Sequence, residues 1–218
     1  MSVREPSHRS ARPLREVVRP TTLIEALRLS RRLGAAITIA SETFQHTGSF
    51  KFRAAYQVAS QVPESLIITA SSGNFGQALA CACQLLGKSC IIVMPETSAQ
   101  VKIEGVREFG GRVDLIDVKQ KSRQARVMEL AGEHENAYVA SAYDDPLVIE
   151  GNASLGAELG ALGRHFDFIL APVGGGGLTS GIIKGLPASG RNIRVVGAEP
   201  LLANDAARSL RAGRAASR

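Results

Sequence analysis

One lysine of this chain has the neighbours that covalent amine chemistry requires. Lys51 lies in the run Thr47-Gly48-Ser49-Phe50-Lys51-Phe52-Arg53, between aromatic residues and behind a glycine and a small hydroxyl residue. Apolar residues follow at helical spacing and Ser49 resembles an N-cap, so we predict that Lys51 lies in the first turn of a helix. The positive end of a helix disfavours an ammonium and lowers its pKa, which favours the free amine that forms a Schiff base. The alternative is an ordinary surface lysine at a helix start.

A run of four glycines offers a binding site for an anion. Gly174, Gly175, Gly176 and Gly177 separate an apolar run over residues 168–173 from a helical pattern that begins at Leu178. Successive glycines let backbone N–H groups converge on one anion, and the positive end of the following helix adds to the attraction. A phosphate monoester fits such a cradle, whereas the dinucleotide pattern Gly-x-Gly-x-x-Gly with a downstream acid is absent. The alternative is a flexible turn.

A third stretch places small polar residues at the start of another helix. The run Ser71-Ser72-Gly73-Asn74-Phe75-Gly76-Gln77 follows an apolar strand pattern over residues 66–70 and precedes a helical pattern over residues 77–86. The N–H groups at the start of that helix would bind a carboxylate. Ser72 is open to two interpretations, because a serine at this position can take part in chemistry or cap the helix.

In this order and spacing, the three stretches resemble the fold-type II pyridoxal-phosphate (PLP) enzymes, in the branch of the serine/threonine dehydratases and serine racemases. The resemblance extends from about Thr21 to the C-terminus. It implies that Lys51 forms the Schiff base with PLP, that Phe50 packs beside the pyridine ring and that Asn74 hydrogen-bonds the 3′-oxygen of the cofactor. The glycine run and Leu178 are implied to hold the phosphate. The substrate carboxylate is implied to bind the loop of Ser71, Ser72, Gly73 and Asn74.

The same resemblance implies a reaction on an amino acid. The implied activity is that of a PLP-dependent ammonia-lyase, which converts L-threonine, L-serine or a similar hydroxy-amino acid to a 2-keto acid and ammonia. A serine racemase is an alternative, because Ser72 matches the serine that racemases use as acid and base on the face opposite the lysine. A shortened, non-catalytic protein that still binds PLP is another. Phe75 stands where the family commonly has a histidine.

Two acids near the C-terminus could hold a divalent cation. Glu199 follows an apolar run, and Ala203 and Asp205 stand four and six residues beyond it. In the metal-activated dehydratases and racemases, which this chain resembles, a glutamate, an alanine carbonyl and an aspartate at these spacings hold the cation. Ligation by oxygen alone would select Mg²⁺ or Ca²⁺. The alternative is a solvated acid at a strand end and a helix cap at Asn204 or Asp205.

Alternating strand and helix patterns predict the elements that carry these stretches. Apolar and β-branched runs predict strands over residues 36–40, 66–70, 89–94, 113–118, 137–140, 168–173 and 193–198. Helical spacing predicts helices over residues 22–32, 77–86, 101–109, 122–134, 147–162 and 178–185, besides the one that starts near Lys51. Such alternation with short connections predicts an α/β fold of doubly wound parallel sheets.

The resemblance to fold-type II PLP enzymes also implies two domains with the cofactor between them. A small α/β domain is expected over residues 66–141, and a large PLP-binding domain over residues 21–65 and 142–218. Members of that family continue further, so the large domain is expected to be incomplete. Residues 1–20 are polar and Arg-rich and are expected to form a mobile tail. The family also implies a homodimer.

Composition argues against several other classes of protein. Arginines at both ends contribute much of the net charge of +6, without interleaved aromatic residues or a nucleic-acid-binding motif, so no nucleic-acid partner is expected. No apolar run reaches the ~18–20 residues that span a bilayer, and no signal-peptide core follows the N-terminal arginines. A cytoplasmic location with no membrane partner is therefore expected. Cys81, Cys83 and Cys90 match neither a disulfide framework nor zinc spacing and are expected to be reduced packing residues.

Overall fold

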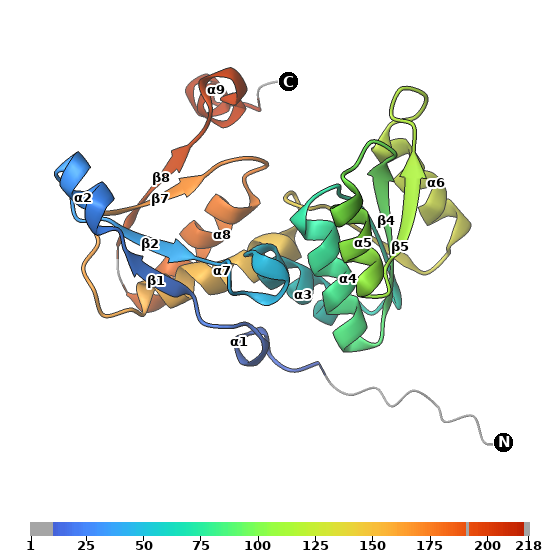
Figure 1. Cartoon of the computed structure of the whole chain (residues 1–218), viewed down its shortest axis with the longest axis horizontal. Coiled ribbons are helices and arrows are strands. Elements are labelled where there is room, and N and C mark those ends of the chain that lie inside the picture. Colours follow the sequence, from blue (N-terminus) through green and yellow to red (C-terminus); the bar gives the residue numbers. More distant parts are fainter. Residues whose placement is uncertain (1–10, 191, 216–218) are drawn as a thin grey trace.

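The computed structural model describes residues 11–190 and 192–215, in which strands and helices alternate along most of the chain (Figure 1). The strands are β1 (Thr22–Glu25), β2 (Thr38–Ser41), β3 (Leu66–Ala70), β4 (Ser89–Pro95), β5 (Arg112–Ile116), β6 (Ala137–Ala140), β7 (Phe168–Pro172) and β8 (Arg194–Ala198). The helices are α1 (Leu14–Val17), α2 (Leu27–Leu33), α3 (Lys51–Gln61), α4 (Asn74–Leu86), α5 (Gln100–Glu108), α6 (Arg123–Glu133), α7 (Pro146–Gly160), α8 (Gly177–Gly185) and α9 (Asp205–Ala212). Short 3₁₀ turns are η1 (His46–Gly48), η2 (Leu186–Ser189) and η3 (Leu201–Ala203).

Four parallel strands form the largest sheet, in the order β5-β4-β3-β6. Successive side chains of a strand point to opposite faces of a sheet, so each strand contributes to two cores. Ile67 and Ile92 pack with α3, α4 and α5 on one face, whereas Ile68 and Ile91 pack with α6 on the other. Helices therefore cover both faces, which confirms the predicted doubly wound parallel arrangement. The three cysteines are free and buried, as expected.

The order of the strands reverses next to β3. The chain passes outward from β3 to β4 and β5, and β6 then returns to the opposite side of β3. In open parallel sheets, a crevice forms outside the carboxyl ends of the strands at such a reversal. The segments that follow β3 and β6 are therefore neighbours at one edge of the sheet.

Helix α7 contacts both α3 and α8 with almost no side chain between the backbones. A Cβ atom added to Gly151 of α7 would lie 2.5 Å from the carbonyl oxygen of Arg53 in α3. A Cβ added to Gly156 of α7 would lie less than 3.0 Å from the carbonyl oxygen of Ile182 in α8. A Cβ added to Gly185 of α8 would likewise lie less than 3.0 Å from backbone atoms of α7. Only glycine permits these separations, so α7 joins α3 and α8 at a fixed distance.

Arg53 is a cation buried in the centre of this packing, with 1% of its surface exposed. Its guanidinium donates to Glu42 Oε2 and Glu158 Oε2, each at 2.7 Å. It also donates to the hydroxyl oxygens of Thr21 and Ser154. Burial acts to lower the pKa of Arg53, but the two carboxylates outweigh burial and raise that pKa. Arg53 therefore stays charged and ties α3 to α7 and to the segment after β2.

Two small sheets lie at the opposite end of the molecule from the four-stranded sheet (Figure 1). Strands β7 and β8 pair in parallel, and β1 and β2 pair antiparallel. The helix predicted over residues 22–32 was therefore wrong at its start, because residues 22–25 form β1 and only α2 is helical. Pairing with β2 and the packing of Leu23 against the core of α7 and α8 outweigh the local helical spacing.

The mobile tail expected over residues 1–20 can be compared only in part, because residues 1–10 lie outside the described residues. The later part differs from the expectation. Leu14, Val17 and Val18 pack against the main core, and the Tyr56 hydroxyl donates to the carbonyl oxygen of Arg12 at 3.0 Å. These three apolar residues among the arginines bury enough surface to hold the segment against α3.

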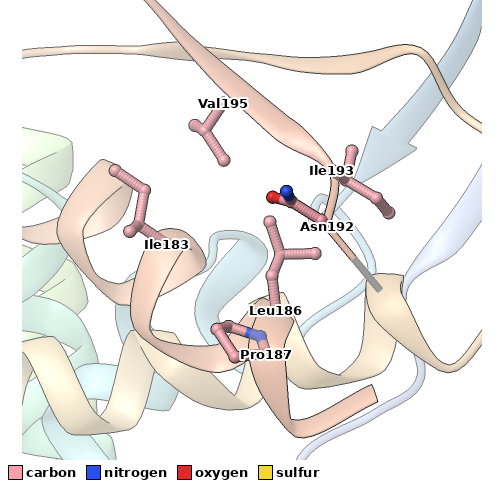
Figure 2. Close-up of a pocket in the computed structure, with 6 residues that line it drawn as sticks. All are labelled: Ile183, Leu186, Pro187, Asn192, Ile193 and Val195. Atoms are coloured by element: carbon pink, nitrogen blue, oxygen red, sulfur yellow. The ribbon is translucent and has the colours of Figure 1, made fainter. Parts of the chain in front are cut away.

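Apolar side chains remain exposed on the outer side of β7 and α8, where Leu170 is 62% and Ile183 53% exposed. Parallel sheets are usually covered on both faces, and the described residues do not cover this one. A hollow of about 300 Å³ lies beside α8. Figure 2 shows the mostly apolar side chains that line it, namely Ile183, Leu186, Pro187, Asn192, Ile193 and Val195. The hollow contains no ionisable side chain, so it is no candidate for acid–base chemistry.

None of the described helices combines the length and the hydropathy needed to cross a membrane.

Replacing Arg53 by methionine tests the role of the buried cation. We expect R53M to lower the free energy of unfolding by about 3–5 kcal/mol, because two largely buried carboxylates lose their partner. Chemical denaturation measures the loss. Arg126→Met is the matched control, since Arg126 also binds Asp114, Glu129 and Glu133, but at the surface, where water screens the pairs. Equal losses in the two variants would contradict this account of Arg53.

Candidate active site

A cavity of about 640 Å³ opens where the carboxyl ends of β3 and β6 meet. It lies at the reversal of strand order, which is where open parallel α/β sheets bind ligands. Its volume is in the range of sites for small ligands and cofactors. Its walls come from Lys51, Ala70, Ser71, Ser72, Gly73, Asn74, Phe75, Ser122, Arg123, Gln124, Val127, Val139, Ala140, Ser141, Ala142 and Tyr143.

Lys51 is the first residue of α3, in agreement with the prediction for its helix, and it lines this cavity. Its Nζ donates to the carbonyl oxygen of Ala142 at 2.7 Å. The same atom lies 5.2 Å from the centre of the Phe50 ring and 5.7 Å from that of Phe75. No carboxylate of the described chain pairs with it, and burial lowers the pKa of Lys51. The amine is therefore shifted towards its uncharged, nucleophilic form.

Ser49 does not cap α3, contrary to the prediction. Its hydroxyl is buried and has no hydrogen-bond partner among the described residues. The residue before the helix is Phe50, and backbone bonds from Phe52 N–H to Ser49 O and from Arg53 N–H to Phe50 O tighten the first turn instead. The start of α3 therefore depends on main-chain bonds, because no side chain caps it.

The loop over residues 71–76, called the serine loop below, is held by its own first residue. The Ser71 hydroxyl accepts from the N–H of Gly76 at 3.0 Å and from that of Gly73 at 3.4 Å. Ser72 is exposed and lines the same cavity as Lys51. Gly73 precedes α4 and has no side chain to cap it, and the first-turn N–H of Gly76 is bonded by Ser71, not by Ser72. The capping alternative for Ser72 is therefore wrong.

Two basic side chains lie at the cavity or next to one of its wall residues. Lys102 of α5 donates to Asn74 Oδ1 at 2.8 Å. Arg123 is the first residue of α6 and lines the cavity with an exposed side chain. The Ser122 hydroxyl caps α6 by accepting from the N–H of Ala125 at 3.1 Å, which sets where Arg123 begins the helix. The two cations make the cavity attractive to carboxylates.

The glycine run (residues 174–177) contacts the cavity through Tyr143. A Cβ added to Gly175 would lie less than 3.0 Å from the Tyr143 ring, and one added to Gly177 would lie 2.6 Å from the Tyr143 carbonyl oxygen. Tyr143 lines the cavity with Lys51, whereas the four glycines do not. Gly176 precedes α8 with a φ of +87°, a conformation that favours glycine. The glycine run therefore borders the cavity without forming its wall.

Glu199 lies at the end of β8 next to α9, which Figure 1 shows well away from the four-stranded sheet. Its carboxylate accepts from the N–H groups of Ala206 and Ala207 at 3.0 and 2.9 Å. Ala203 ends η3 and Asp205 begins α9. Among the residues that the structure describes, no three or more His, Cys, Asp or Glu side chains form a group that could hold a metal ion. Glu199 thus caps α9. The alternative interpretation had expected a cap of this helix at Asn204 or Asp205.

Three cavity residues were not predicted from sequence patterns: Arg123, Ala142 and Tyr143. Arg123 belongs to the segment after β5, and the other two follow β6. Their position could have been predicted, because the segments that follow neighbouring parallel strands lie at the same edge of the sheet, where ligands bind. No local pattern, however, indicates that Tyr143 packs on the glycine run.

Comparison with known proteins places this geometry in a family. The family model described as "Pyridoxal-phosphate dependent enzyme" matches residues 14–218. The biosynthetic L-threonine dehydratase of Pasteurella multocida is 36% identical over 203 residues, which are 91% of this chain and 39% of that protein. The L-threo-3-hydroxyaspartate ammonia-lyase of Saccharomyces cerevisiae is 33% identical over 204 residues, which are 92% of this chain and 62% of that protein.

The solved structure of maize serine racemase shares the fold, with a TM-score of 0.87 at 28% identity over 94% of this chain and 65% of that chain. The chain thus spans between 39% and 65% of the length of these three proteins. The match of the family model over almost the whole chain agrees with the parallel α/β fold and with a half-buried lysine amine in the cavity at the carboxyl ends of the strands. The chain belongs to the family of the pyridoxal-phosphate-dependent enzymes, of fold type II, as its three motifs predicted.

Proposed function

We propose that the whole protein is a PLP-dependent ammonia-lyase that converts a hydroxy-amino acid such as L-threonine or L-serine to a 2-keto acid and ammonia. The main support is the half-buried amine of Lys51, whose pKa is lowered, in one cavity with the serine loop. Family membership supports the cofactor, and the similarity to a threonine dehydratase supports the reaction.

The residues around Lys51 fit PLP. Lys51 would hold the cofactor as a Schiff base, with Phe50 beside the ring and Asn74 near its oxygen substituent. The glycine run and Leu178 would hold the phosphate, because the first N–H groups of α8 have no acceptor within the helix. Gly174 and Gly176 leave open space where a side chain would stand. When bound, PLP withdraws electrons from the α-carbon of the substrate amino acid.

Lys51 is the group proposed to move the proton of the α-carbon, because it lines the cavity and burial lowers its pKa. In the holoenzyme, the amine of Lys51 would take the α-proton of the substrate. Loss of that proton and of the β-hydroxyl together would amount to loss of one water, and the unsaturated amine product would hydrolyse to the keto acid and ammonia. The N–H groups at the start of α4, together with Ser71, Ser72 and Gly73, would bind the substrate carboxylate.

Racemisation is the second candidate reaction, and Ser72 is the observation that favours it. Ser72 is exposed and lines the cavity that holds Lys51, so two groups could exchange protons with the α-carbon. The chain is also similar to maize serine racemase. Measuring keto-acid release against formation of the D-amino acid distinguishes the two reactions, and formation of neither would favour the non-catalytic alternative.

The charge of the cavity favours a substrate with a second carboxylate. Arg123 lines the cavity and has no ion-pair partner among the described residues, and Lys102 lies beside the serine loop. The yeast relative is named for such a substrate, L-threo-3-hydroxyaspartate. We therefore include β-hydroxy amino acids with an acidic side chain in the proposed substrate class.

The remaining expectations stay predictions. They are the cation site of Glu199, Ala203 and Asp205, the homodimer, the cytoplasmic location and the small domain over residues 66–141. In the structure the Glu199 carboxylate accepts from two N–H groups of α9, and the proposed reaction is written without a role for the cation.

Borohydride reduction after addition of PLP tests the role of Lys51. Reduction should attach the cofactor permanently to Lys51, as mass spectrometry of peptides would show, and Lys51→Ala should abolish the label. Lys88→Ala is the matched control: burial also lowers the pKa of Lys88 and its amine also donates to a backbone carbonyl, that of Val62, but it does not line the cavity. Equal labelling of K51A and the unchanged chain would rule out this assignment.

The reactivity of Lys51 should depend on pH in a way that follows from its burial. Because burial lowers the pKa of Lys51 below the usual lysine value of 10.5, its free amine should form at lower pH than that of an ordinary lysine. Amine labelling at a series of pH values, read by mass spectrometry, measures the midpoint. The exposed Lys119 is the internal reference. A Lys51 midpoint at or above that of Lys119 would refute the expected direction.

Arg123→Gln tests the substrate class. For hydroxyaspartate we expect kcat/KM to fall about tenfold, because one hydrogen bond between charged groups is lost. For L-threonine, which has no second carboxylate, kcat/KM should be unchanged. Arg107→Gln, an exposed arginine of α5 outside the cavity wall, is the matched control. A parallel loss for both substrates would mean that Arg123 does not select between them.

A further inference from the structure

Asn152 of α7 is a fully buried polar residue that the proposed reaction does not use, with 1% of its surface exposed. Its Nδ2 donates to the carbonyl oxygen of Gly177 at 3.1 Å. Because a carbonyl oxygen can only accept, this bond determines which amide atom faces Gly177. Asn152 Oδ1 is buried and has no hydrogen-bond partner among the described residues. An unpaired buried oxygen costs free energy, so packing alone does not account for an asparagine here.

The bond acts on the first peptide group of α8. Gly177 begins that helix, and its carbonyl belongs to the same planar peptide group as the N–H of Leu178. In a trans peptide the C=O and the N–H point in opposite directions, so a bond that fixes one fixes the other. The Leu178 N–H is among the groups at the helix start that have no acceptor within the helix. The Asn152 bond therefore helps the helix to hold the direction of a donor next to the glycine run.

Close packing leaves this peptide group little freedom to turn. A Cβ added to Gly181 of α8 would lie less than 3.0 Å from the Cβ of Asn152, so α8 rests directly on this side chain. A Cβ on Gly177 would lie 2.6 Å from the carbonyl oxygen of Tyr143. Gly177 is thus held from one side by Tyr143 and from another by Asn152. Loss of the Asn152 bond removes the one side-chain hydrogen bond that the described structure gives this peptide group.

We propose that Asn152 is a positioning residue for phosphate recognition: it holds the Gly177–Leu178 peptide group so that its N–H is directed at the phosphate of PLP. The inference rests on the proposed function, because it requires the phosphate at the glycine run. Asn152 itself is buried and does not line the cavity of Lys51. Its loss should therefore weaken recognition of the phosphate and leave the reaction of Lys51 with an aldehyde unchanged.

The test compares the binding of PLP with that of pyridoxal, which has the same aldehyde but no phosphate. Both can form a Schiff base with Lys51, so the ratio of the two dissociation constants isolates the contribution of the phosphate. Asn152→Leu keeps the approximate size and removes both the donor and the unpaired oxygen. We expect N152L to weaken PLP binding about fivefold, as for one neutral hydrogen bond, and to leave pyridoxal binding unchanged. Its thermal midpoint should not fall, because the unpaired oxygen is removed as well.

Two further variants separate positioning from packing. Leu159→Ala is the control, because Leu159 is a buried residue of the same helix that packs on α8 but lies two turns away from Asn152. It should lower the thermal midpoint and leave the ratio of the two dissociation constants unchanged. Asn152→Asp keeps the shape and places a carboxylate at the Gly177 carbonyl, so it should weaken PLP binding by more than N152L does. If N152L does not fold, the comparison of PLP binding with pyridoxal binding is made on N152D instead.

The outcomes distinguish this inference from the proposed function. If the unchanged chain prefers PLP to pyridoxal and neither Asn152 variant alters that preference, the positioning role is refuted and the phosphate site stands. If the unchanged chain binds both aldehydes equally, the proposed phosphate site is itself contradicted. If the Asn152 variants weaken the binding of PLP and of pyridoxal alike and lower the thermal midpoint as L159A does, Asn152 serves packing alone.

Discussion

The contact between the backbones of α3, α7 and α8 is the constraint on which the arrangement of the site depends. Gly151 lets α7 approach α3, and Gly156 and Gly185 let α7 approach α8. At these separations no side chain lies between the helices, so the distance cannot be adjusted by repacking. The amine of Lys51 at the start of α3 and the glycine run before α8 therefore take their positions from one rigid unit.

Two cations near the start of α3 illustrate how the surroundings of a charge decide its role. Arg53 is buried with two carboxylates, which raise its pKa and keep it charged. Lys51 has only a backbone carbonyl as hydrogen-bond partner in the described structure, and burial lowers its pKa. A buried charge persists only where it is paired, so one helix turn holds a permanent structural charge and an amine available for chemistry.

Local sequence patterns predicted correctly those elements whose tertiary contacts favour the same secondary structure as the local sequence does. Strands β3 and β6 have the predicted bounds, since apolar runs between turn residues form parallel strands in this core. The errors have a common cause in partners that lie elsewhere in the chain. Residues 22–25 pair with β2 instead of forming a helix, and Leu14 packs on the core within a segment expected to be mobile. Ser49 has the residue type of a cap but is buried without a bond.

Three chemically distinctive segments are recognisable from the amino-acid sequence alone, because the character of each depends on residues adjacent in the chain: Lys51 with its aromatic neighbours, the serine loop and the glycine run. Which of these segments meet depends on the fold. It brings Lys51 and the serine loop into one cavity with Arg123, and it places the glycine run behind Tyr143. It also uses Glu199 as a helix cap. The physical reason is that distances between segments depend on strand order and on helix contacts, which pair residues far apart in the chain and leave no mark in a local pattern.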